Sequence, residues 1–190
     1  MSLGKQAKIL NETQQKVILS HLDAGRHSDR NKVMFLLSCD AALRAKEIAE
    51  LTWEMLTDGE GNLTDEIRIQ DKASKGRSGG VVYQSKRLQE AIRKHSEGRV
   101  LKGRVILSQK GKGMTAQVVI NWFYSLYDDL GYDGCSSHSG RRTAITRWAR
   151  NIHAAGGTLV EVSRMARHSS VSMTQRYIAL SETACRKVVG

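Results

Sequence analysis

The spacing of hydrophobic residues changes once along this chain of 190 residues and then changes back. Residues 11–51 and 86–177 carry apolar side chains at helical spacing, whereas residues 66–70 alternate between apolar and polar side chains and residues 81–83 are a second candidate strand. A polar, glycine-rich stretch joins the two alternating segments as the tip of a hairpin would. The pattern predicts a mainly α fold with a small antiparallel β-sheet, which we expect to have three strands.

Residues that commonly cap helices mark where several helices should begin. Asn11, with Gln14 three residues later, predicts a helix that runs to about Ala24. Four more helices are expected to begin at the capping residues Ser28, Thr115, Thr158 and Ser170. The last of them would carry Tyr177, and further helices are expected over residues 46–51 and from about residue 138.

The charge of the chain points to its partner. A formal net charge of +11 favours a polyanion, most often nucleic acid. Aromatic residues make up only 5% of the chain, so duplex phosphate contacts fit better than stacking on single strands. The alternative is a solvated basic surface that aids solubility. No proline, repeat or low-complexity stretch marks a linker, so residues 1–190 are expected to form a single domain.

Features of membrane and secreted proteins are missing from the sequence. No apolar run approaches the ~20 residues of a membrane span, and the first residues lack the apolar core of a signal peptide. The three cysteines are odd in number and widely scattered, which is typical of a reducing cytoplasm. We therefore expect a cytoplasmic, DNA-associated protein with no membrane partner.

Three short stretches hold residues suited to chemistry on a phosphodiester. Residues 43–48 read Leu-Arg-Ala-Lys-Glu-Ile, and residues 138–143 read His-Ser-Gly-Arg-Arg-Thr. Near the C-terminus, Tyr177 follows His168 by nine residues. Two isolated arginines, two histidines and a late tyrosine are what attack on a phosphodiester by a phenol requires. Taken singly, each has an ordinary interpretation, such as a core tyrosine or a surface His-Arg pair.

In their order and spacing, these stretches resemble the catalytic signature of the tyrosine recombinase (phage integrase) family. Residues 138–146 resemble the family's H-x-L-R-H/R-T-x-x-T pattern, and residues 43–48 resemble its L-R-x-x-E-L pattern. The resemblance covers about residues 40–180 and implies the tyrosine-recombinase catalytic-domain (DNA breaking-rejoining) fold. The chain departs from the family at Arg167, where a glycine is usual, and in lacking a proline that ends the hairpin. The family's N-terminal core-binding domain is expected to be absent.

The resemblance implies a site-specific recombinase or integrase that cuts and rejoins double-stranded DNA through a 3′-phosphotyrosyl link. It implies that Tyr177 is the nucleophile and that Arg44 and Arg141 stabilise the charge of the transition state. His138 would accept the proton of the tyrosine. Because the covalent link keeps the phosphodiester energy, no ATP, metal or other cofactor is required. Other recombinase protomers, as a tetramer on DNA, are the implied partners.

The remaining site residues follow from the same resemblance. His168 would hydrogen-bond the phosphate, and Glu47 would orient the cations. Lys75 in the hairpin would protonate the departing 5′ oxygen, with Lys72 as the alternative if residues 79–80 are an insertion. The alternative interpretation, a flexible basic hairpin that only contacts phosphate, also remains open. Further DNA contacts are expected from Lys72, Arg77, Arg142 and Arg147.

Four other interpretations remain open at the level of sequence. Residues 45–51 look like the first helix of a helix-turn-helix, although strands follow instead of a recognition helix. Cys135 and His138 have the spacing of half a zinc site, without a second pair. A type IB topoisomerase would use similar chemistry on one strand. A vestigial integrase module could hold DNA or a partner without cutting.

Overall fold

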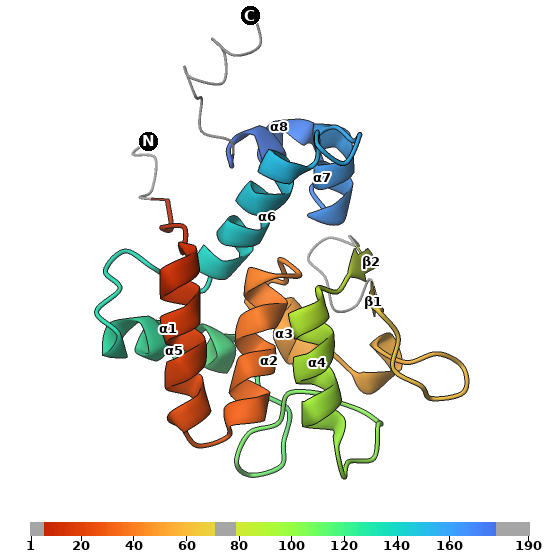
Figure 1. The fold of residues 1–190 in the computed structure, drawn as a ribbon. Helices are drawn as coiled ribbons and strands as arrows, with labels where there is room; N and C mark the ends of the chain where they lie inside the picture. Colours follow the sequence, from red (N-terminus) through yellow and green to blue (C-terminus); the bar gives the residue numbers. More distant parts are fainter. Residues whose placement is uncertain (1–5, 71–78, 178–190) are drawn as a thin grey trace, which may run out of the picture. The chain divides into compact units, whose positions relative to one another are not determined.

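The computed structural model describes residues 6–70 and 79–177 (Figure 1). These residues form two compact units, divided between Ala144 and Ile145. The boundary falls within helix α6, Ser139–Asn151. None of the helices in the described part of the chain is both long and apolar enough to cross a bilayer. The two units are described separately.

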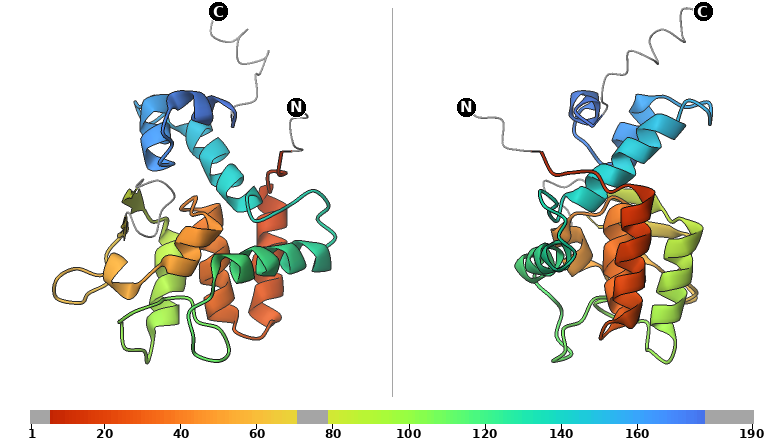
Figure 2. Two further views of the ribbon diagram at one scale, coloured as in Figure 1. Left: turned by 180° about the vertical axis from the view of Figure 1, so that it is seen from behind. Right: turned by 60° about the vertical axis from the view of Figure 1, so that its left-hand side comes forward.

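The first unit is built around a buried central helix. Its helices are α1 (Glu12–Ala24), α2 (Ser28–Cys39), α3 (Ala45–Glu50), the 3-10 turn η1 (Trp53–Met55), α4 (Lys86–Ser96) and α5 (Ala116–Asp129). Helix α2 lies between α1 and α4 (Figure 1), and its residues 33–39 are all buried. A helix that is buried all round must be surrounded by partners. Helix α5 runs across the long helices and packs against α3 (Figure 2).

The sheet has two strands among the described residues, not the three that the alternation predicts. Strand β1, Glu66–Ile69, pairs antiparallel with β2, Gly80–Tyr83, and Ile67 faces Val82 across the pair. Both of these side chains are buried, so the sheet covers the core with one face. The hairpin tip, residues 71–78, lies outside the described part.

The segment between η1 and β1 forms a turn. After η1, the side chain of Asp58 accepts hydrogen bonds from the backbone of Glu60 and Asn62, both at 2.9 Å, which closes a tight turn. Around this turn only the single bridge between Thr57 and Leu63 forms. This segment therefore folds as a turn with one bridge and adds no strand to the described sheet.

The helix starts follow the capping residues closely, with one exception. Asn11 and Gln14 form the reciprocal capping box that the sequence predicts for α1. Thr115 caps α5 through its side chain, also as predicted. The prediction for Ser28 is wrong by one residue, because His27 occupies the cap position in the left-handed conformation (φ 61°). Its carbonyl accepts the first helical hydrogen bond, from Asn31.

The second unit contains the end of α6 and two short helices, α7 (Leu159–Met165) and α8 (Val171–Gln175), which pack on each other. Thr158 caps α7 in a box with Glu161, as the sequence predicts. Ser170 precedes α8 without a capping hydrogen bond from its side chain. The helix ends at Gln175, so Tyr177 lies beyond the helix that was expected to carry it.

The first turn of α6 lies so close to α2 that Gly140 has no space for a side chain. A Cβ on Gly140 would lie 2.9 Å from the Cβ of Ser38, and nearer still to its Oγ. We expect Gly140→Ala to reduce the free energy of unfolding by roughly 1–3 kcal/mol, the usual cost of overpacking. Chemical denaturation measures this change. Gly59→Ala is the matched control, because a Cβ there meets nothing within 4 Å. Equal stabilities of the two variants would contradict the close contact.

Candidate active site

Arg44 stands at the end of a buried turn that joins α2 to α3. The backbone N–H of Asp40 donates to Leu36 and that of Leu43 to Leu37, so the turn folds back on the last turns of α2. Ala42 adopts a left-handed conformation (φ 52°), which is uncommon for a residue with a side chain. The turn itself is buried from residue 40 to residue 43, and Arg44 is partly exposed beside it.

Glu47 holds both the backbone and the side chain of Arg44. Its Oε2 accepts the Arg44 backbone N–H at 2.7 Å, and its Oε1 accepts Nη1 of the guanidinium at 2.9 Å. The Glu47 side chain is fully buried, whereas 24% of the Arg44 side chain is exposed. A buried carboxylate needs such partners to offset its lost hydration. The pair fixes the guanidinium with part of its surface open to a ligand.

Arg141 reaches the same turn from α6. It is buried, with 3% of its surface exposed, and its Nη1 donates a hydrogen bond to the carbonyl of Ala42. His138 lies just before α6, and its carbonyl accepts the backbone N–H of Arg142 in the first turn. Arg141 lies three residues after His138, which places both at the start of the helix.

The two arginines act electrostatically on His138. Partial desolvation of the ring, followed by the positive charges of Arg141 and Arg44, lowers the pKa of His138 from its ordinary value. Desolvation is the largest cause of the lower pKa, although the residue as a whole is exposed. The neutral form is therefore favoured near pH 7, and a neutral imidazole can accept a proton. We call Arg44, His138 and Arg141 the cation cluster.

Titration of His138 checks this arrangement. We expect the ring to titrate below pH 6.5, the value of an unperturbed histidine, when followed by NMR. Arg44→Gln should raise the midpoint, because a cation is lost and Glu47 loses its partner. Arg104→Gln is the matched control: Arg104 pairs with Glu50 instead and is not among the groups that shift His138. A midpoint that Arg44→Gln leaves unchanged would contradict the cluster.

His168 and Tyr177 come together in the second unit. Their rings are stacked, with centroids 5.4 Å apart and planes at 25°. Nδ1 of His168 is 2.8 Å from Oγ1 of Thr174, and the backbone N–H of Tyr177 donates to the carbonyl of Thr174 at 2.9 Å. Thr146 donates to the Tyr177 carbonyl at 3.2 Å. The spacing of nine residues thus allows the chain to form α8 and to bring the tyrosine ring back to the histidine.

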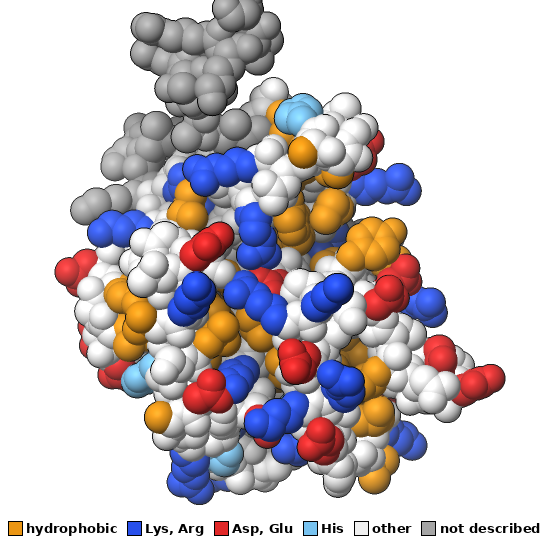
Figure 3. All heavy atoms as spheres, in the orientation of Figure 1, with side chains coloured by type: hydrophobic (Ala, Val, Ile, Leu, Met, Phe, Trp, Pro, Cys, Tyr) orange, Lys and Arg blue, Asp and Glu red, His pale blue; other side chains and the backbone are white. Residues whose placement is uncertain are grey.

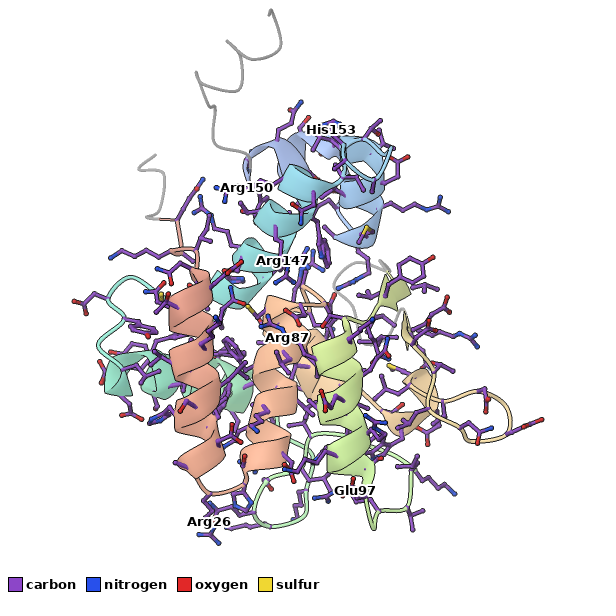
Figure 4. The ribbon with its side chains drawn as sticks, in the orientation of Figure 1. Arg26, Arg87, Glu97, Arg147, Arg150 and His153 are labelled. Carbon is purple, nitrogen blue, oxygen red and sulfur yellow. The ribbon has the colours of Figure 1, made fainter. Side chains whose placement is uncertain are left out.

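The other predicted site residues are the two hairpin lysines and three arginines expected to contact DNA. Lys72, Lys75 and Arg77 lie outside the described residues. Arg142 donates from Nη1 to the carbonyl of Ala7 at 2.9 Å, so part of its guanidinium holds the N-terminal segment. Arg147 is half-buried on α6 (Figure 4).

Sequence reasoning missed the part played by Ala42. Its carbonyl receives Arg141 because the residue takes a left-handed conformation. No signal could have located it, since alanine rarely adopts that conformation and backbone carbonyls leave no trace in composition.

The charged surface and the grouping of metal-ligating side chains indicate which ligands the described residues could bind. On the face shown in Figure 3, Lys and Arg side chains are interspersed with Asp and Glu. Across residues 6–70 and 79–177, no three His, Cys, Asp or Glu side chains are grouped as a metal site would need. Among the described residues of the first unit, the cation cluster brings two guanidiniums to one turn, which suits an anionic ligand.

Comparison with known proteins relates this fold to DNA-processing enzymes. The crystal structure of XerA recombinase superposes with a TM-score of 0.73 at 16% identity, covering 99% of this chain and 64% of that one. The Tn1549 transposon integrase in complex with a circular intermediate DNA gives 0.75 at 18%, covering 98% and 66%. XerH recombinase bound to its difH substrate gives 0.70 at 16%, covering 100% and 55%.

The chain thus spans less than two thirds of the XerA chain, and at these identities the likeness concerns the fold. A search of curated protein sequences gives no match. Residues 8–184, nearly the whole chain, match the phage integrase family. With its helical fold, small antiparallel sheet and resemblance to tyrosine recombinase structures, the chain belongs to the phage integrase family.

Proposed function

We propose that this chain is the catalytic part of a site-specific DNA recombinase that cuts and rejoins double-stranded DNA. The cation cluster carries the proposal. Arg141 is buried against Ala42, Arg44 is held by a buried carboxylate, and the neutral form of His138 is favoured. Two guanidiniums fixed before the substrate arrives can stabilise charge on a phosphate without reorganising during the reaction.

The proposed reaction needs no electron transfer and no outside energy source. The Tyr177 oxygen attacks phosphorus, its proton passes to His138, and the bond from phosphorus to the 5′ oxygen breaks. Lys75 gives a proton to that oxygen, which leaves as a hydroxyl. Arg44 and Arg141 bind the non-bridging oxygens throughout. A 5′-hydroxyl from another strand then attacks the phosphotyrosyl link and releases the tyrosine.

His168 has two proposed roles, one toward the phosphate and one toward Tyr177. Its ring stacks on Tyr177, its Nδ1 lies 2.8 Å from Oγ1 of Thr174, and an imidazole nitrogen can hydrogen-bond a phosphate oxygen. The same contacts fix the orientation of both rings. We therefore expect His168 to bind the phosphate and to restrict the tyrosine.

Double-stranded DNA is the proposed partner, and further protomers are proposed to assemble on it. The Tn1549 integrase and XerH structures contain DNA, and lambda integrase is seen as a dimer bound to a core site. The net charge of +11 supports the same partner.

Salt dependence tests the DNA contact. If about six phosphates are neutralised, the logarithm of the association constant should fall against the logarithm of salt concentration with a slope of about −5. Fluorescence anisotropy with a labelled duplex, between 50 and 200 mM salt, measures it. A salt-independent affinity, or equal binding to an acidic protein, would contradict a duplex partner.

A trapping experiment tests the reaction itself. Nicked duplexes with randomised sequence around the nick lose the short 5′-terminated fragment after cleavage and so trap the covalent product. We expect adducts that survive denaturing electrophoresis and form in EDTA. Strong binding with no adduct from any duplex would instead support a non-catalytic DNA-binding module.

A further inference from the structure

A second arginine–carboxylate pair lies at the other end of the turn that presents Arg44. Asp40 follows α2 directly, and only 1% of its side chain is exposed. Arg87, the second residue of α4, donates from Nε to Oδ2 of Asp40 at 2.6 Å and from Nη2 to Oδ1 at 2.5 Å. Ser85 adds a hydroxyl donor to Oδ2 at 2.6 Å. One carboxylate thus receives three hydrogen bonds from the start of α4, where Arg87 lies (Figure 4).

The pair is connected to α6 as well. Nη2 of Arg87 also donates to Oε1 of Gln15 at 2.8 Å, and the Gln15 amide donates to the carbonyl of Leu10 at 3.1 Å. The backbone N–H of Leu10 donates to Oγ1 of Thr143 on α6 at 2.9 Å. Hydrogen bonds therefore link Asp40 to the helix that carries Arg141.

Three ties from three helices hold the five-residue turn from Asp40 to Arg44. Arg87 of α4 binds Asp40 at its start. Arg141 of α6 binds the Ala42 carbonyl at its centre, and Glu47 of α3 binds Arg44 at its end. The first tie is the one that lies outside the catalytic signature.

We propose that Asp40 and Arg87 are positioning residues that fix the turn on which Arg44 is presented and Arg141 is received. The pair adds little net stability, because desolvation of the buried Asp40 carboxylate, and solvent screening of the 40% exposed Arg87 side chain, offset most of the attraction. A bidentate fork does restrict orientation strongly. This geometry is therefore better suited to fixing the left-handed turn than to stabilising the fold. For catalysis, the inference rests on the function proposed above.

The titration of His138 distinguishes positioning from a simple change of charge. Asp40→Asn removes an anion and leaves Arg87 uncompensated, and both effects alone would lower the pKa of His138. If the turn instead loosens and Arg44 moves away, the pKa rises, because a cation that lowers it has gone. Arg87→Lys keeps the positive charge and loses the bidentate contact with Asp40. In that variant, only movement of the turn can shift the pKa of His138.

We expect the NMR titration midpoint of His138 to rise in both Asp40→Asn and Arg87→Lys. The control is Asp29→Asn, at the opposite end of α2, where the carboxylate forms an exposed pair with Lys94 at 3.4 Å. This control should leave the midpoint unchanged. A midpoint that falls in Asp40→Asn, or that Arg87→Lys does not move, overturns the proposal. If Asp40→Asn does not fold, the result for Arg87→Lys decides.

Adduct formation provides a second readout. At saturating nicked duplex, and at a temperature where each variant is folded, Asp40→Asn and Arg87→Lys should form adduct roughly tenfold to a hundredfold more slowly. Affinity for DNA should change much less, and Asp29→Asn should match the unmodified chain. Unchanged adduct rates in both variants overturn the proposal. If the unmodified chain forms no adduct, the recombinase function fails, while the His138 titration still tests the positioning role.

Discussion

Tyr177→Phe abolishes the covalent protein–DNA adduct and leaves DNA affinity within a few-fold: this is the largest effect that we expect from one substitution. The change removes the nucleophilic oxygen and keeps the ring that stacks on His168. The backbone contacts of Tyr177 with Thr174 and Thr146 do not involve the phenol. Denaturing electrophoresis measures the adduct, and anisotropy measures the affinity.

Tyr124→Phe is the matched control for this experiment. Tyr124 lies on α5 with 67% of its surface exposed, so losing its hydroxyl should affect neither adduct nor binding. An adduct that persists in Tyr177→Phe would assign the nucleophile to another residue.

The second large effect concerns the lysine of the hairpin. We expect Lys75→Ala to slow cleavage by roughly 10²–10⁴, the usual contribution of one general acid. A duplex with sulfur in place of the 5′-bridging oxygen should largely restore the rate, because a thiolate leaves without protonation. Single-turnover cleavage of the normal and the sulfur-containing duplex measures the loss of rate and the extent of its rescue.

Lys72→Ala decides between the two candidate lysines. It should weaken binding modestly and leave the cleavage rate of the normal and sulfur-containing duplexes nearly unchanged. If the sulfur substrate rescues Lys72→Ala and not Lys75→Ala, Lys72 is the acid. If it rescues neither, the hairpin only contacts phosphate.

The sequence alone determined the features that depend on neighbouring residues. Asn11 and Gln14 satisfy each other's backbone across one turn, so the start of α1 is encoded within four residues. The spacing from His168 to Tyr177 is likewise local, because α8 closes the loop between them. The resemblance to the phage integrase family also rests on such short stretches and is confirmed over residues 8–184.

Tertiary structure decided what depends on residues far apart in the chain. Arg141 meets the carbonyl of Ala42 across 99 positions, and Arg87 meets Asp40 across 47. Hydrophobic spacing reports which face of an element is buried, but not which partner covers it. The number of strands also depended on tertiary structure: the described residues form two strands, and the segment before β1 folds into a turn at Asp58. Short stretches specify the chemical groups of the candidate site, and tertiary contacts from α4 and α6, together with Glu47 of α3, hold the turn that carries Arg44.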